Sequence, residues 1–407
     1  MACVVTDQHP SAFKIVMLLC AAQVLAMTGF ATYPALLTRI MDAWKLSGAE
    51  AGLVGGAFFF GYMVAVPFLS GLTDRMDARL VFAMSCVLAA MGSAGFGWFA
   101  GGVASGVFFQ ALTGAGLAGT YMPGLKAMTD RVQGPSQSRY VSFYTATFGL
   151  GASVSLLLAG WCSAVLSPEA TFVVASVFPL VAIPMVIWSI RPHQPVGGLK
   201  RWWPSFSGVW SQVAVRQYII GYAVHCWELF GLRSWQVAFF AFAFGMSAKQ
   251  AWVSPTEAAA ILNLLGLPAS ILGNEMAARL GRQRWIGAIM LASGVLAWVA
   301  GASSVLPWML TLAVAALYNV VVMADSASLT AGLVAESDPS QRGAAMALYS
   351  LGGFGAGFVA PVVFGAVLDH TGGHQSPLAW TLAMGALGLG GLLWSLRLRW
   401  ARQRAQT

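Results

Sequence analysis

Charged residues are scarce in this sequence: Asp, Glu, Lys and Arg together make up only 9% of its 407 residues. A soluble globular domain carries about 25% charged residues. Hydrophobic residues make up 58% of the chain, which is more apolar surface than a soluble protein of this length can keep from water. The composition therefore excludes an ordinary soluble domain.

The sequence also lacks the short motifs of common catalytic and nucleotide-binding sites. It contains no HExxH, GxSxG or P-loop pattern. Its five cysteines have neither metal-type nor paired spacing, so we interpret them as small hydrophobic core residues. These absences argue against a membrane-embedded enzyme and a nucleotide-driven pump, and we expect no metal and no cofactor.

Hydrophobic residues come in blocks of about 18–25, each long enough to cross a hydrocarbon core of roughly 30 Å as a helix. The first block is too long for the core of a signal peptide, so we expect it to be retained. The blocks predict helices at 14–37, 51–71, 80–100, 103–126, 140–165 and 170–190, followed by 217–244, 257–278, 285–304, 308–332, 344–368 and 377–396.

This pattern predicts an all-α membrane protein of twelve transmembrane helices in two six-helix bundles, residues 1–190 and residues 217–407. Between them, residues 191–216 form the longest polar stretch that contains Pro and Gly, which is typical of a linker. The tryptophans and basic residues of this stretch suit the cytoplasmic surface of a membrane.

Lysine and arginine fall mostly on one side of this arrangement. If both termini are cytoplasmic, 18 of the 22 basic residues lie on that side, and only Arg39, Lys45, Arg233 and Lys249 do not. This positive-inside bias predicts a multi-pass protein of the inner (plasma) membrane with cytoplasmic termini. Because the basic residues form no continuous stripe, we expect the lipid bilayer and no nucleic acid as partner. The oligomeric state stays open.

The two halves of the chain resemble each other. Pro135-Ser136-Gln137 recurs 204 residues later as Pro339-Ser340-Gln341, about half the chain length of 407 residues. Two single residues recur at nearly the same spacing: Tyr144 as Tyr349, and Gly160 as Gly365. A parallel duplication that produces two pseudo-symmetric bundles is the simplest explanation.

A tight cluster of charges, Ser70-Gly71-Leu72-Thr73-Asp74-Arg75-Met76-Asp77-Ala78-Arg79, follows the second block. It resembles the signature loop of the major facilitator superfamily, which has a glycine, a leucine, an Asp-Arg pair, a second glycine and basic residues. Leu72, Asp74, Arg75 and Arg79 match this pattern, whereas Ser70 and Asp77 stand where the family usually has glycine. The resemblance in layout covers the whole chain and implies the fold of that family and transport by alternating access.

In this interpretation the loop gates the cytoplasmic face. We expect Asp74 to face the start of the eleventh helix, because a carboxylate gains about 0.3–1 kcal/mol near a helix N-terminus. The alternative, that these charges only fix topology, stays open. The predicted gating residues are Asp74, Arg75 and Arg79 and, in the second half, where Ala278 replaces the aspartate, Glu275, Arg279 and Arg282.

The fourth and fifth helices depart from two patterns of the family. Gln110 stands where proton-coupled members usually have arginine, which puts a proton relay through the fourth helix in doubt. The fifth helix has Gly149 and Gly151 but lacks the proline of the antiporter signature. A drug/proton antiporter is therefore not favoured by motif.

The seventh helix places His225, Glu228 and Arg233 within a stretch that should cross the bilayer. Each charge in hydrocarbon costs roughly 2.5–3.5 kcal/mol, so such residues are functional candidates. His225 and Glu228 share a helix face, and Asp325 of the tenth helix should lie at a similar depth to His225. We predict that these four residues bind substrate and couple protons, with Arg233 suited to an anionic group; the alternative is a structural polar lock.

In the family, the first, fourth, seventh and tenth helices line a central cavity. The resemblance therefore implies that further polar side chains reach this cavity: Gln23, Tyr33, Gln110, Tyr121 and Asn319. For all of these except Gln110, a hydrogen bond between helices is an equally good explanation.

Together these features predict a secondary active transporter of a small polar or anionic organic solute, with the proton as coupling ion. Symport and antiport use the same fold and stay open. The alternatives are an efflux antiporter for drugs or metabolites, and a sensor that keeps a transporter fold without transport.

Overall fold

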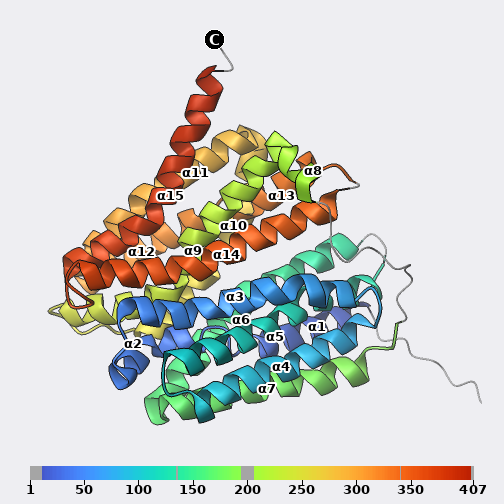
Figure 1. The fold of residues 1–407 in the computed structure, drawn as a ribbon, viewed down its shortest axis with the longest axis horizontal. Helices are drawn as coiled ribbons and strands as arrows, with labels where there is room; N and C mark the ends of the chain where they lie inside the picture. Colours follow the sequence, from blue (N-terminus) through green and yellow to red (C-terminus); the bar gives the residue numbers. More distant parts are fainter. Residues whose placement is uncertain (1–11, 134–135, 194–205, 340, 405–407) are drawn as a thin grey trace, which may run out of the picture.

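The computed structural model describes residues 12–133, 136–193, 206–339 and 341–404, and these residues form helices and connecting turns with no strand. Figure 1 shows two bundles lying side by side. The first contains α1 (Ala12–Ala26), α2 (Thr32–Trp44), α3 (Gly48–Leu72), α4 (Ala78–Phe99), α5 (Val103–Thr129), α6 (Gln137–Val165) and α7 (Pro168–Ser189).

The second bundle follows a short helix, α8 (Phe206–Ser211), that lies within the stretch interpreted as a linker. The rest of that stretch, 194–205, lies outside the described residues. The bundle contains α9 (Val213–Met246), α10 (Pro255–Leu280), α11 (Arg282–Ala302), α12 (Trp308–Met323), α13 (Ser326–Glu336), α14 (Arg342–His370) and α15 (Pro377–Arg404), with a short 3-10 turn, η1 (Ser303–Val305), before α12.

The twelve predicted spans are confirmed. Ten helical segments within the described ranges are long and apolar enough to cross a membrane, and α5 and the pair α1–α2 supply the remaining two predicted spans. The first and tenth spans are each broken into two helices, α1 with α2 and α12 with α13. The sequence pattern did not predict these breaks.

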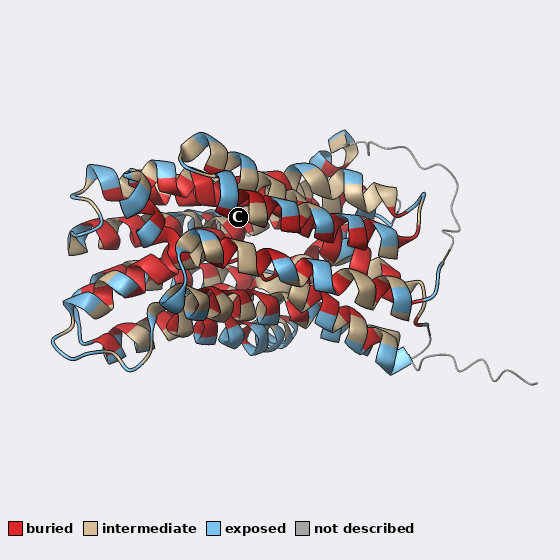
Figure 2. Ribbon diagram, turned by 90° about the horizontal axis from the view of Figure 1, so that it is seen from below, coloured by how far each residue is buried: buried red, intermediate tan, exposed pale blue. Residues whose placement is uncertain are grey.

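Large hydrophobic side chains cover the outside of the protein as well as its interior. Buried residues lie where helices meet, and many exposed positions run along the outer surface (Figure 2). Exposed side chains such as Phe99, Trp188 and Trp252 are large and apolar. Such a surface is stable in lipid, where neighbouring hydrocarbon takes the place of water.

The chain alternates in direction, so the helix ends gather at two faces. We call the face where α1 begins and α15 ends the terminal face, and the opposite one, with the α2–α3 and α14–α15 connections, the distal face. In Figure 1 the distal connections lie at the left and α8 at the right.

The two bundles touch mainly through α3 with α14, α6 with α10, and α2 with α9, and α3 also contacts α9. Along the distal half of the antiparallel pair α3–α14, a Cβ atom on Gly48, Gly52 or Gly56 would collide with backbone atoms of α14. Near the terminal face, a Cβ on Gly71 or Gly343 would meet open space. The backbones are therefore in contact distally and apart at the terminal ends.

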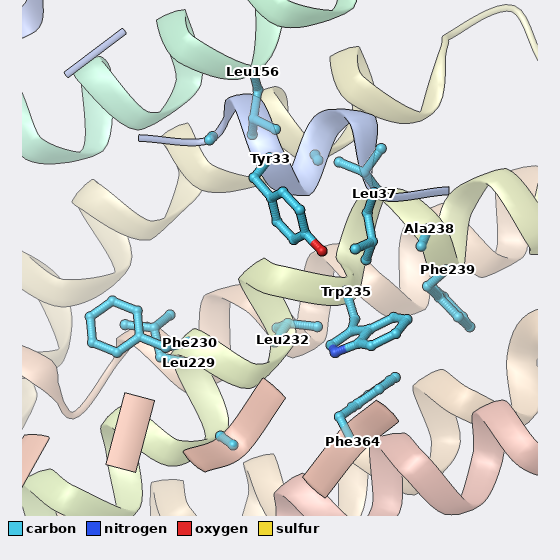
Figure 3. Close-up of a cluster of buried hydrophobic side chains, with 14 of the residues drawn as sticks. Tyr33, Leu37, Leu156, Leu229, Phe230, Leu232, Trp235, Ala238, Phe239 and Phe364 are labelled. Carbon is cyan, nitrogen blue, oxygen red and sulfur yellow. The ribbon is translucent and has the colours of Figure 1, made fainter. Parts of the chain in front are cut away.

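Helices α2 and α9 close the centre of the same distal half. Figure 3 shows Tyr33 and Leu37 of α2 projecting toward the part of α9 that carries Trp235. Trp235 stacks on Phe364 of α14, with ring centroids 5.2 Å apart. Because all these side chains are buried, the described conformation is closed at the distal face.

Candidate functional site

The tenth span is interrupted where a buried acid stands. Helix α12 ends at Met323, α13 begins at Ser326, and Asp325 lies between them with φ −101° and ψ −15°. The indole nitrogen of Trp285 donates a hydrogen bond to the carbonyl of Ala324 at 3.1 Å. A break in a membrane helix is tolerated when neighbours satisfy the freed backbone groups in this way.

His225 of α9 contacts the acid at this break. Its Nδ1 lies 2.8 Å from Oδ1 of Asp325, and the two side chains are only 1% and 3% exposed. The predicted proximity of these residues is therefore present in the structure. Because both side chains are shielded from solvent, the electrostatic interaction between them is stronger than it would be in water.

Aromatic rings seal the pair and connect it to α14. The ring of Tyr222 lies 6.0 Å from that of His225 and stacks on Tyr349 at 3.7 Å, with an angle of 7° between the two tyrosine planes. The hydroxyl of Tyr349 is 2.9 Å from Oγ1 of Thr330 on α13. Helices α9, α13 and α14 therefore meet around the pair.

Glu228 points away from the other bundle. Ser293 of α11 donates a hydrogen bond to its Oε2 at 3.0 Å, and Gly391 of α15 packs beside the same oxygen. The Tyr318 hydroxyl of α12 faces the same carboxylate.

This placement differs from the expectation that Glu228 reaches a central cavity. Residues three apart on a helix are separated by about 60° around its axis. Here that rotation directs His225 toward the α12–α13 break and Glu228 toward α11 and α15. Glu228 therefore belongs to the interior of the second bundle.

A small cavity of about 20 Å³ lies between the bundles. Helices of both bundles supply its polar lining: Tyr33 from α2, Gln110 from α5, Arg233 and Ser234 from α9, and Asn263 from α10. One water-sized sphere occupies roughly 10–15 Å³. The cavity is therefore nearly collapsed in this conformation, and a solute would need more space than it offers.

Three polar atoms in this cavity have no hydrogen-bond partner within the described part of the chain: Nε2 of Gln110, Nε of Arg233 and Oδ1 of Asn263. Buried polar groups are normally satisfied, so unpartnered ones at one place indicate a binding site. Phe30, Phe58 and Phe59 line the same cavity. The site therefore combines a cation, two amides and an aromatic wall. Asn263 was missed in the sequence because an asparagine in the eighth helix matches no motif.

The other predicted cavity residues bond within their own bundle. Gln23 accepts a hydrogen bond from the Tyr144 hydroxyl at 3.0 Å, and Asn319 donates to the carbonyl of Ala315 on its own helix at 2.8 Å. Tyr121 packs edge-on against Phe148. Tyr33 lines the cavity while its hydroxyl donates to the carbonyl of Ala51 at 3.0 Å. Gln23 and Tyr33 therefore make hydrogen bonds between helices, whereas Asn319 bonds within its own helix.

The predicted gating residues lie at the terminal face. Asp74 and Arg75 are exposed, and Gln341, which precedes α14, accepts a hydrogen bond from Gln212 at 2.8 Å. In the described part of the chain, no ion pair joins Glu275 to the basic residues of the second loop: Glu275 and Arg279 are exposed and Arg282 is partly buried. Within the described residues, no hydrogen bond or ion pair joins Asp74 to α14.

Asp77, not Asp74, is the centre of the charge cluster. It accepts hydrogen bonds from Nη2 of Arg131 at 2.7 Å and from Nε of Arg79 at 2.9 Å. The backbone N–H of His193 donates to it at 2.8 Å. Sequence reasoning missed Arg131, because that residue follows α5 and comes close only in the fold. The cluster ties the ends of α4, α5 and α7 within the first bundle.

Asp77 should make this bundle sensitive to acid. Burial raises the pKa of Asp77, but the hydrogen bonds from His193, Arg131 and Arg79 and the charge of Arg131 outweigh burial and leave the pKa below its ordinary value of 3.8. A lowered pKa adds stability at neutral pH that is lost as the pH falls through the lowered pKa.

We therefore expect Asp77→Asn to lower the melting temperature at pH 7, and the gap from the unsubstituted protein to close as the pH falls below about 4. Thermal unfolding in detergent at several pH values measures this gap. Asp42→Asn, at an exposed position on the distal face, is the control and should show no such gap. A gap that stays constant at every pH would show that the carboxylate charge is not responsible.

Comparison with known proteins identifies the fold. A family model described as the Major Facilitator Superfamily matches residues 19–317. A bacterial homologue of the human lysosomal transporter Spinster, in an inward-facing and occupied conformation, has a TM-score of 0.74 at 16% identity and covers 97% of each chain. The POT family transporter PepTSo has a TM-score of 0.75 at 14% identity, covering 96% of this chain and 98% of its own.

One curated protein is similar in sequence. The niacin transporter NiaP of Acinetobacter baylyi is 24% identical over 123 residues, which cover 30% of this chain and 28% of that protein. The match therefore spans less than a third of either protein.

Proposed function

Because the chain belongs to the Major Facilitator Superfamily, we propose that it is a secondary active transporter that moves a small anionic organic solute by alternating access. The family consists of multi-pass membrane transporters rather than enzymes. The polar cavity between the two bundles, where Nε of Arg233 has no partner among the described residues, is the observation that carries the assignment of the solute.

The lining of the cavity favours a flat carboxylate. A guanidinium group with a free N–H binds carboxylates through charge-assisted hydrogen bonds. Phenylalanine rings next to it provide an apolar surface for a ring or conjugated chain. The similarity to a protein named as a niacin transporter supports this class, since niacin is a small aromatic carboxylate.

We place proton coupling on the pair of His225 and Asp325, with Glu228 as a second exchangeable group in the same bundle. A proton that reaches Asp325 cancels the carboxylate charge and weakens its hold on His225. His225 and Arg233 lie eight residues apart on α9, about 12 Å along the helix. A shift of α9 therefore links the two sites.

We propose that the protein lies in the inner membrane with its terminal face toward the cytoplasm. The excess of lysine and arginine on that side supports it. The described conformation, closed at the distal face, is then inward-facing. The loop at Asp74 would meet α14 only when the terminal face closes.

Removal of the cationic group should abolish recognition of the solute. We expect Arg233→Ala to reduce counterflow of nicotinate or benzoate in proteoliposomes by about tenfold or more, because one charge-assisted hydrogen bond contributes about 1.5–3 kcal/mol. Lys249→Ala removes an exposed positive charge in the α9–α10 connection. This control variant should transport normally. Unchanged counterflow in Arg233→Ala would exclude this residue as the anion site.

Without the buried pair of His225 and Asp325, a pH gradient should no longer drive transport. We expect Asp325→Asn and His225→Gln to retain counterflow but to lose accumulation driven by an imposed pH gradient. Asp42→Asn, at an exposed carboxylate, is the matched control. If both pair variants still accumulated the solute under an imposed pH gradient, proton coupling at this site would be refuted. The sign of the pH gradient that drives accumulation separates symport from antiport.

A further inference from the structure

A carboxylate of the second bundle caps a helix of the first. Asp369, near the distal end of α14, accepts a hydrogen bond on Oδ1 from the backbone N–H of Gly48 at 2.7 Å. Its Oδ2 accepts a second one from the N–H of Ala49 at 2.9 Å. Gly48 and Ala49 are the first two residues of α3, so this single side chain bridges the two bundles.

The contact completes a cap that α3 cannot supply alone. Ser47 and Glu50 form a capping box within the first bundle: the Ser47 hydroxyl accepts from the N–H of Glu50, and the Glu50 carboxylate accepts from the N–H of Ser47. The first N–H groups of a helix have no partner inside the helix. The capping box does not bond the N–H groups of Gly48 and Ala49, and both donate to the carboxylate of Asp369 instead.

The capped end sits at the tip of a closely packed seam. A Cβ on Gly48 would lie 2.8 Å from Oδ1 of Asp369 and 2.5 Å from the carbonyl oxygen of Gly365. Glycines at positions 52 and 56 bring the same two backbones together farther along. Glycine at positions 48, 52 and 56 of α3 allows α14 to approach closely. This close approach brings the Asp369 carboxylate to the first turn of α3.

The other long seam between the bundles also carries a carboxylate, because Glu257 of α10 interacts with the indole of Trp161 on α6. Between α6 and α10, Gly160 packs against Thr256, and the Ser153 hydroxyl donates to the carbonyl of Ala260 at 3.0 Å. The start of α10 is capped by its own box of Ser254 and Glu257. Asp369 differs from Glu257 because it accepts hydrogen bonds from two backbone N–H groups of a helix in the opposite bundle.

We propose that Asp369 is a distal latch: it stabilises the distally closed conformation by capping α3 from the opposite bundle, and each transport cycle must break this contact. Alternating access separates the distal ends of the bundles, and both hydrogen bonds join groups on opposite sides of that separation. The latch depends on the fold and on alternating access, and not on the identity of the solute or of the coupling ion.

Hydrogen–deuterium exchange of the full-length protein in lipid nanodiscs tests the latch. Asp369→Asn keeps the shape of the side chain but removes its charge. Exchange should rise about tenfold or more in the first turn of α3 and also in the distal ends of α2 and α9, residues 38–44 and 240–246. Residues of both segments line a distal cavity of about 380 Å³, and the two described hydrogen bonds of Asp369 go to Gly48 and Ala49 rather than to these segments.

The control is Glu50→Gln, which weakens the cap of the same helix from inside the first bundle. It should raise exchange in the first turn of α3 only. If Asp369→Asn matched Glu50→Gln or the unsubstituted protein at residues 38–44 and 240–246, Asp369 would be a local cap and the latch would be refuted.

A second variant attacks the contact from the first bundle. Gly48→Ala places a Cβ against Asp369 and Gly365 and should expose the same remote segments. Slow exchange in α4 and α7 in the same spectra reports that each variant is folded. Remote segments that stay protected in a folded Gly48→Ala protein would also overturn the proposal.

Discussion

The burial of charge inside the second bundle is the constraint on which the rest of the structure depends. A charged side chain in hydrocarbon is expensive, and it is tolerated when a partner is close. Asp325 meets this condition at the α12–α13 break, where His225 lies 2.8 Å away. The broken helix, the bond from Trp285 to Ala324 and the stacked tyrosines all surround this pair.

Helix α14 connects this pair to the contact between the bundles. Its Tyr349 belongs to the aromatic group around His225, and its Asp369 caps α3 of the first bundle. Twenty residues, about 30 Å of helix, separate these two positions. A change in the charge of the pair that moves α14 would therefore act on the distal seam without any contact between the solute and Asp369.

The fold was largely predictable from the sequence, because membrane-spanning helices require long apolar blocks and the blocks are separated by polar turns. The helix breaks at 27–31 and 324–325 were not predictable, because both lie inside apolar blocks and contain neither a proline nor a polar cluster. The proximity of His225 and Asp325 followed from their depth in two antiparallel helices. Their role in coupling stays a prediction.

The direction in which each side chain points was harder to predict. Glu228 accepts a hydrogen bond from Ser293. This contact depends on how α9 is rotated about its own axis, and no sequence motif encodes that rotation. Asp77 and Arg131 lie 54 positions apart, and no motif in the sequence connects them. No sequence pattern identified Asp369, because its contact with α3 of the opposite bundle exists only in the fold.

The central claim is that a proton on the pair of His225 and Asp325 responds to a solute bound near Arg233. Proton uptake or release on addition of nicotinate or benzoate to the purified protein, followed with a pH-indicator dye in weak buffer, tests it most directly. The account predicts a proton signal in the unsubstituted protein and none in Asp325→Asn, although that variant still binds the solute. An equal signal in both proteins would contradict the account.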